Sequence, residues 1–314
     1  MELKLLGDFL QILLDVYKIS RKNVKLIASI TILPIFLHSI IFSFNIFSIK
    51  PLFADLVVKQ SFLLITSPNT PEFLNLLMGV IHDIKILFGV ESIFLLAASV
   101  SSFLFSIATI FATAITYGGK NISINDLLSR TIKSWRRPFV TWFHTTLFFT
   151  GFNFFYLAAE LLLMLIVYEH HVSLSKILLV VALSFLSYLS IVWNLAFVIS
   201  VLEEIYGIEA LGEATKIVKG MKLHGFLLNL LFAVITVILF QGLRLIPLKQ
   251  STKVQVIIGL LVVNSMYLVR MILMMGYTVL YYKCKKTLGE DVELQGSAEY
   301  VKIPTVSLIK EDIP

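Results

Sequence analysis

Long apolar runs separated by short polar segments dominate the chain. Six runs have about 20 or more residues, the length a helix needs to cross the hydrocarbon core of a bilayer. They lie at about 26–48, 87–116, 140–168, 177–202, 225–246 and 254–282. Backbone polar groups in lipid must be satisfied within their own segment, which helices achieve. The pattern therefore predicts an all-α polytopic membrane protein, with six transmembrane helices in residues 1–286 and a disordered tail at 287–314.

A different pattern occupies residues 3–19. Its polar residues recur at steps of four and three, which forms one stripe along a helix. These residues are Lys4, Asp8, Gln11, Asp15 and Lys18. Leucines and aromatics fill the other faces, so we expect an amphipathic helix. It either lies in the headgroup region or docks against the helix bundle.

The segment between the first two spans contains a turn signal. Ser67, Pro68 and Asn69 precede Thr70 and Pro71, a run of residues that favours turns. A mostly apolar helix is predicted over 72–87, leading into the second span.

Composition and charge support the membrane assignment. Hydrophobic residues make up 58% of 314 and charged residues 15%, against roughly half and a quarter in soluble domains. The net charge of +6 comes from basic residues placed just outside the spans. Of the Lys and Arg residues outside the spans, 18 lie on the side of the termini and 7 on the other. This bias predicts cytosolic N and C termini and an anionic leaflet, rather than nucleic acid, as partner.

Two connecting segments, 117–138 and 203–224, are related by an offset of 86 residues. Each carries three basic residues at i, i+3 and i+6, which would lie on one flank of a helix. They are Arg130, Lys133 and Arg136 in the first copy, and Lys216, Lys219 and Lys222 in the second. We expect them to contact lipid headgroups or partner proteins. Either a duplicated span–helix–span unit or chance similarity between two basic interfacial helices explains the match.

The second segment also carries a resemblance. The run Val201-Leu-Glu-Glu-Ile-Tyr206-Gly207-Ile-Glu-Ala210-Leu, followed by Lys219-Gly220, resembles a signature of plant multi-spanning membrane proteins of unknown function. The span–amphipathic helix–span layout is similar to bacterial membrane domains found beside glycerophosphodiester phosphodiesterases. The resemblance implies a six-span α-helical membrane protein. It implies no catalytic or ligand-binding residue.

Four polar residues deep within the predicted spans stand out as candidates: Glu160, Arg270, Asn194 and Asn264. Ionisable residues at such positions are costly and are functional candidates. An ion pair between Glu160 and Arg270 is one option. Depth within the spans matches better for Asn194 with Arg270 and for Asn264 with Glu160. These residues either hold the bundle together by interhelical hydrogen bonds or line a substrate or proton path.

The motifs of common enzymes are missing from the sequence. We find no phosphate-binding loop, nucleophile elbow or HExxH motif, and we predict no catalytic, metal-binding or cofactor-binding residue. The single cysteine, Cys284, excludes an intramolecular disulfide. Cys284 lies just outside the last span between lysines, so it is either a palmitoylation site or an ordinary reduced thiol.

Three hypotheses for function follow. The first is a scaffold or regulator that binds anionic lipid or partner proteins through its basic cytosolic helices. The second is a small transporter or channel that uses Glu160 and Arg270. The third, a membrane-embedded lipid-modifying enzyme, has no motif in its support. The sequence is compatible with the endoplasmic reticulum and with the plasma membrane.

Overall fold

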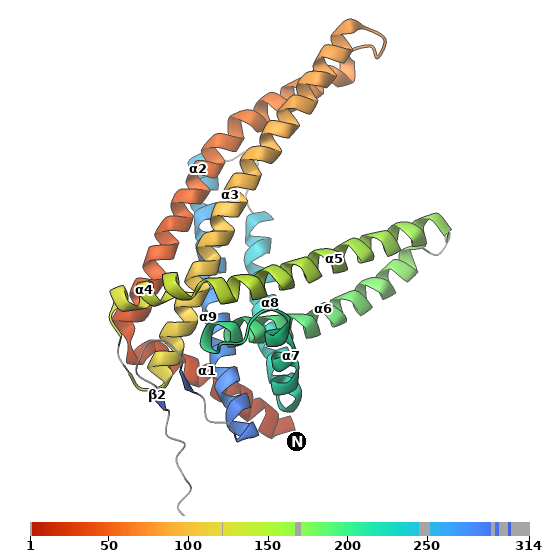
Figure 1. The fold of residues 1–314 in the computed structure, drawn as a ribbon. Helices are drawn as coiled ribbons and strands as arrows, with labels where there is room; N and C mark the ends of the chain where they lie inside the picture. Colours follow the sequence, from red (N-terminus) through yellow and green to blue (C-terminus); the bar gives the residue numbers. More distant parts are fainter. Residues whose placement is uncertain are drawn as a thin grey trace, which may run out of the picture. The chain divides into compact units, whose positions relative to one another are not determined.

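The structure is a computed structural model. It describes residues 2–120, 122–166, 171–244, 252–289, 293–294 and 301–302. Over these residues the fold is helical apart from turns and one short strand pair (Figure 1). The α-helices are α1 (Glu2–Lys22), α2 (Val24–Ile65), α3 (Pro71–Tyr117), α4 (Ile124–Ser134), α5 (Arg136–Ile166), α6 (His171–Leu202), α7 (Ile208–Ile217), α8 (Lys222–Arg244) and α9 (Thr252–Leu288). A 3-10 turn, η1 (Val218–Gly220), follows α7. The predicted all-α class is confirmed.

Six of these described helices are long and apolar enough to cross a membrane: α2, α3, α5, α6, α8 and α9. They correspond to the six predicted spans, but two of them are much longer than predicted. α2 continues to Ile65 rather than ending near residue 48, and it passes through Pro51. α3 begins at Pro71, so the separate helix predicted at 72–87 is the first part of the second long helix.

The chain divides into two compact units. The hairpin unit contains residues 29–105 and 236–269. The core unit contains residues 1–28, 106–235 and those from 270 onward. Each unit has its own set of side-chain contacts.

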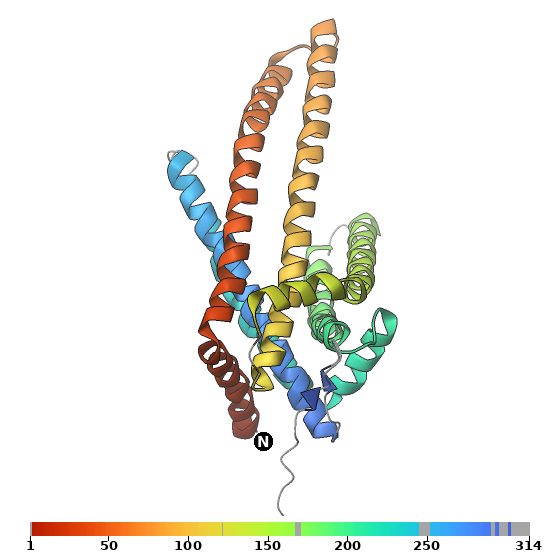
Figure 2. The same ribbon diagram turned by 60° about the vertical axis from the view of Figure 1, so that its left-hand side comes forward.

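In the hairpin unit, α2 and α3 run side by side in both views (Figures 1 and 2). The predicted turn joins them, and the Thr70 N–H donates to the Ser67 carbonyl at 3.2 Å. Farther along, Lys59 Nζ lies 2.7 Å from Asp83 Oδ2 and 2.8 Å from Asp55 Oδ2. Because Asp83 is buried, this three-residue cluster fixes the register of one helix against the other.

The core unit is built on α5 and α6, which pack along each other, with α7 folded against both. Phe149 and Trp193 meet edge to face with ring centroids 6.2 Å apart, and Phe152 packs on Phe185 at 5.6 Å. These contacts cover about one turn of α5 and about two turns of α6. They contribute to the packing of α5 against α6.

α1 packs within the core unit through one stripe of its surface. Its buried residues are Phe9, Ile12, Val16 and Ile19, at the spacing of one helix face. Asp15 Oδ2 lies 3.1 Å from Lys283 Nζ of α9. This is the docked arrangement that the sequence left as an alternative. A second face stays apolar and exposed, with Leu14 54% and Tyr17 58% accessible.

The two short helices repeat a layout. In chain order, α4 connects α3 to α5, and α7 with η1 connects α6 to α8. In α4 the Thr131 hydroxyl donates to the Leu127 carbonyl, and in α7 the Thr215 hydroxyl donates to the Leu211 carbonyl. The predicted single flank for each basic triplet is wrong, however. Both α4 and α7 end before the third basic residue, which begins the following long helix.

The described part of the tail is small. It comprises the last residues of α9 and an antiparallel pairing of β1 (Glu293–Leu294) with β2 (Val301–Lys302). The rest of the predicted disordered segment lies outside the described residues.

Candidate functional site

The segment around Glu203 forms a joint of the core unit, where α5, α6, α7 and α9 meet. Glu203, just past the end of α6, accepts a hydrogen bond from the Tyr281 hydroxyl. The same carboxylate lies 3.3 Å from Lys285 Nζ, and both side chains are mostly buried. Its neighbour Glu204 reaches Arg137 of α5 at 3.5 Å, in a more exposed position. The two adjacent acids therefore connect α6 to different helices, α9 and α5.

Gly207 gives the joint its sharp turn into α7. Its φ of +64° and ψ of −133° form a backbone conformation that is essentially restricted to glycine. The Gly207 N–H donates to Thr141 Oγ1 of α5 at 2.8 Å, and this contact is buried. A Cβ at residue 207 would lie 3.4 Å from a methyl group of Val140. The turn thus requires glycine for its dihedral angles, whereas the added Cβ itself would make only an ordinary close contact.

The sequence signature contained the two acids and the glycine but not their partners. Tyr281 and Lys285 are four residues apart, so they share one face of α9. That spacing was the signal that could have identified this face. Thr141 gave no signal, because a threonine in an apolar helix usually bonds its own backbone.

Six basic side chains lie on or directly after the two short helices α4 and α7, and we call them the junction cations. They are Arg130, Lys133, Arg136, Lys216, Lys219 and Lys222. All are exposed except Arg130, which is half-buried. Lys216 lies 3.3 Å from Glu213, and Lys222 Nζ stands 5.6 Å from the ring centroid of Tyr188. The opposite faces of α4 and α7 are buried, through Leu127 and Thr131 and through Ala210, Ala214 and Ile217.

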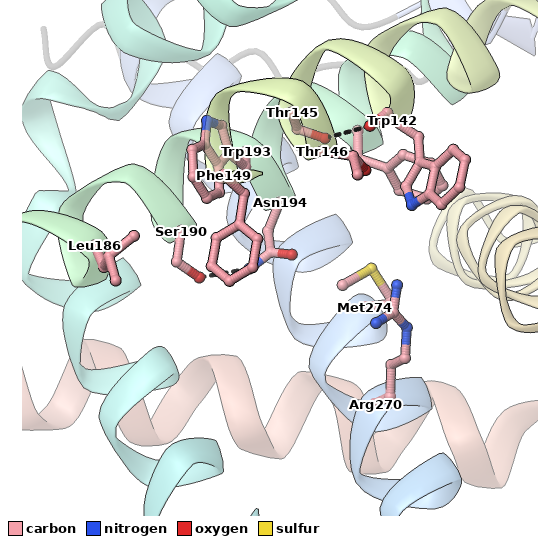
Figure 3. Close-up of a pocket in the computed structure, with 11 residues that line it drawn as sticks. Trp142, Thr145, Thr146, Phe149, Leu186, Ser190, Trp193, Asn194, Arg270 and Met274 are labelled. Atoms are coloured by element: carbon pink, nitrogen blue, oxygen red, sulfur yellow. Dashed lines mark hydrogen bonds between the residues drawn. The ribbon is translucent and has the colours of Figure 1, made fainter. Parts of the chain in front are cut away.

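A cavity of about 380 Å³ lies between α5, α6 and α9 in the core unit (Figure 3). Its lining combines aromatic rings with hydroxyl, amide and guanidinium groups. The residues are Trp142, Thr145, Thr146, Phe149, Leu186, Ser190, Trp193, Asn194, Phe197, Arg270 and Met274. Two of the four intramembrane candidates, Asn194 and Arg270, therefore reach the same cavity. Their predicted match in depth agrees with this placement.

Asn194 also belongs to a hydrogen-bond network behind the cavity. Its Nδ2 donates to Ser190 Oγ at 3.3 Å, and its side chain bonds to Tyr277 of α9. The Tyr277 hydroxyl donates to Asn229 Oδ1 of α8 at 2.6 Å. The network joins α6, α8 and α9, which is the interhelical role that the sequence left open. Such bonds contribute roughly 0.6 kcal/mol each in membranes.

The other two candidates lie elsewhere. In the hairpin unit, Asn264 of α9 donates to Ser39 Oγ of α2 at 2.9 Å, another bond between helices. Glu160 is not among the residues that line the cavity. Along α5 it is about 16 Å beyond Phe149, the cavity residue nearest to it in sequence. Its Oε2 is buried without a hydrogen-bond partner.

Cys284 is fully buried in α9. Burial keeps the thiol away from an acylating enzyme, which disfavours palmitoylation and favours an ordinary reduced thiol. Among the described residues, no group of three or more His, Cys, Asp or Glu side chains is placed to hold a metal ion.

Comparison with known proteins gives a family. A family model described as Domain of unknown function (DUF8558) matches residues 1–303. No curated protein and no solved structure matches the chain. The match covers all of the described helices, including the joint, the junction cations and the cavity. The chain therefore belongs to the DUF8558 family.

Proposed function

We propose that this protein is an integral membrane scaffold or regulator that binds the anionic headgroups of one leaflet through its junction cations. One observation supports this most strongly. At both junctions a short helix buries one face against the protein, while five of the six basic side chains around the two helices are exposed. Each Lys or Arg held near an anionic surface contributes roughly 1 kcal/mol to binding. Six of them make a substantial attraction that falls as salt increases.

The orientation belongs to the same proposal. The excess of basic residues beside the termini places both ends and the junction cations in the cytosol, where the leaflet is anionic. Protease should therefore remove a C-terminal tag only from the cytosolic side of sealed vesicles. We also propose that the protein is of plant origin and shares its layout with the bacterial membrane domains. Membrane lipid is the proposed partner, and nucleic acid is not.

The test uses lipid preference around Trp135, which is 39% exposed and lies between Lys133 and Arg136. The full chain with Trp142→Phe and Trp193→Phe keeps this one tryptophan. It is reconstituted with brominated phosphatidylserine or brominated phosphatidylcholine, and fluorescence quenching is compared. We expect stronger quenching by the serine lipid, weakened by salt and lost when the junction cations become glutamine.

The control replaces Lys85 and Lys176, exposed lysines outside the junctions, by glutamine, and it should keep the preference. If all six substitutions leave the preference for the serine lipid intact, the proposal fails. If the protein with all six junction cations intact shows no lipid preference, a protein partner becomes the better explanation for the basic surface.

A transporter is the second candidate, because Arg270 lines a cavity within the spans. Glu160 lies apart from this cavity, so the structure offers no support for a path that uses both residues. Flux in reconstituted vesicles that is abolished by Arg270→Gln but unaffected by Glu160→Gln would favour transport through the cavity. The enzyme hypothesis receives no support from any described cluster of side chains.

A further inference from the structure

The N-terminal helix α1 carries two separate apolar stripes. One stripe packs into the core unit and is buried. The other, which we call the outer stripe, repeats every three or four residues along one face of the helix. It consists of Leu6, Leu10, Leu14 and Tyr17. These four side chains are between 50% and 58% exposed. A continuous apolar stripe on a protein surface marks a place where another apolar phase or molecule binds.

The charges of α1 differ between its buried and its exposed sides. Asp15 is only 20% exposed and lies 3.1 Å from Lys283 Nζ of α9. Asp8 is half-buried. In residues 5–22, the part of α1 whose exposure is described, every exposed charged side chain is basic. These cations are Lys18, Arg21 and Lys22. The outer surface of α1 is therefore positive, which is complementary to an anionic partner.

Arg21 connects this positive surface to the outer stripe. Its guanidinium carbon stands 5.8 Å from the centroid of the Tyr17 ring. Arginine and tyrosine each combine an apolar body with a polar tip, and both are favoured where the hydrocarbon of a membrane meets its headgroups. The C-terminal half of α1 thus has the chemistry of a helix that lies in a lipid interface.

The position of α1 in the chain favours lipid over an acidic protein as the partner. α1 ends at Lys22 and α2 begins at Val24, so a single residue separates them. The Ile27 N–H donates to the Asn23 carbonyl at 3.0 Å, so helical hydrogen bonding resumes at once. α2 is one of the six described helices long and apolar enough to cross a membrane. The basic end of α1 is therefore tethered to a membrane helix, and a membrane surface is the apolar phase within its reach.

We propose that α1 is an interfacial helix that docks on the core unit with its buried stripe and inserts its outer stripe among the lipids of an anionic leaflet. Lys18, Arg21 and Lys22 then lie at the level of the headgroup phosphates. α1 carries none of the junction cations, and its binding depends on apolar insertion as well as on charge. Binding at α1 and binding at the junction cations can therefore fail or succeed independently in experiment.

Spin labels on the full chain, held in nanodiscs of phosphatidylcholine with phosphatidylserine, test the insertion. Leu10→Cys places a label on the outer stripe. Gln11→Cys places one on the next residue, which is also exposed but lies about 100° away around the helix. The parent chain, whose single cysteine is the buried Cys284, gives the labelling background. Relaxation of the label by oxygen, which concentrates in hydrocarbon, is compared with relaxation by a water-soluble nickel chelate.

We expect the ratio of oxygen relaxation to nickel relaxation to be several-fold higher for Leu10→Cys than for Gln11→Cys. The ratio for Leu10→Cys should fall in discs of phosphatidylcholine alone. This dependence on lipid should vanish when the three cations of α1 are replaced by glutamine. Replacement of the six junction cations by glutamine should leave the ratio unchanged, and this control separates the two sites.

Three results would overturn the proposal. Equal ratios for Leu10→Cys and Gln11→Cys would show that α1 has no lipid-facing side distinct from its polar side. Low accessibility of the Leu10→Cys label to both reagents would show that protein, rather than lipid, covers the outer stripe. Equal ratios in the two kinds of disc would show that α1 does not select an anionic leaflet. Tyr17→Cys and Lys18→Cys repeat the comparison farther along the helix, so the test survives if one variant does not fold.

Discussion

Replacing Gly207 by alanine tests whether the joint depends on its backbone geometry. Alanine at φ +64° and ψ −133° costs roughly 1–3 kcal/mol if the backbone stays in place. If the backbone relaxes instead, the 2.8 Å bond from the Gly207 N–H to Thr141 is lost. A buried N–H without a partner costs a similar amount, roughly 1–3 kcal/mol. Either route predicts a loss of about 1–3 kcal/mol.

Gly212 provides the matched control in the same helix. It has no atom within 4 Å of an added Cβ and no positive φ. Gly212→Ala should be neutral or stabilise α7 by up to about 1 kcal/mol. Thermal unfolding of the purified chain in one detergent, followed by tryptophan fluorescence, measures both variants. At about 2 °C per kcal/mol, Gly207→Ala should lower Tm by roughly 2–6 °C.

Thr141 accepts the hydrogen bond from Gly207, so its substitution tests the same contact. Thr141→Val removes the acceptor and should lower Tm to a similar extent, whereas Thr141→Ser keeps the hydroxyl. The combination with Gly207→Ala should be less than additive, since both changes remove the same contact. Equal Tm values for Gly207→Ala and Gly212→Ala would refute the assignment of this turn.

Three further predictions concern single side chains, and the first two compare a buried carboxylate with a more exposed one. Glu203→Gln should destabilise the chain by about 1–3 kcal/mol, because it weakens a mostly buried contact with a tyrosine and a lysine. Glu204→Gln, in an exposed pair, should change stability by less than about 0.5 kcal/mol; equal Tm shifts would contradict this difference. Asp83→Asn should lower Tm more than Asp55→Asn, because the first carboxylate is 9% and the second 57% exposed, and the reverse order would refute the proposed register contact. Cys284 is fully buried, so maleimide should label it only after denaturation; rapid labelling of the folded chain, read by mass spectrometry, would show that the thiol is accessible.

The sequence was sufficient for the helical class and the six spans because lipid imposes a strong requirement on composition and length. The sequence did not predict the full length of a helix that continues past polar residues. The predicted first span ends at about residue 48, before Lys50, Pro51 and Asp55, yet α2 runs through all three. The spacing of Asp55 and Lys59, four residues apart, was the available sign of a continuing helix.

The basic triplets show a second limit of pattern analysis. A periodicity of three residues predicted one helix flank, but a new helix begins at Arg136 and another at Lys222. Pro138 was a signal for the first start, since proline is tolerated in the first turn of a helix. The cavity could not be derived from periodicity at all. Its lining comes from three helices, and only Asn194 and Arg270 stood out in the sequence as polar residues within spans.

The length of α2 and α3 has a consequence for the membrane itself. With 42 and 47 residues, they extend for about 63 and 70 Å, whereas a whole bilayer with its headgroups measures about 40–45 Å. Even a tilt of about 40°, the upper end for such helices, leaves α2 spanning about 48 Å. Apolar side chains such as Leu64, 82% exposed, continue to the turn. The hairpin is therefore longer than a bilayer of ordinary thickness requires, even when its helices are tilted.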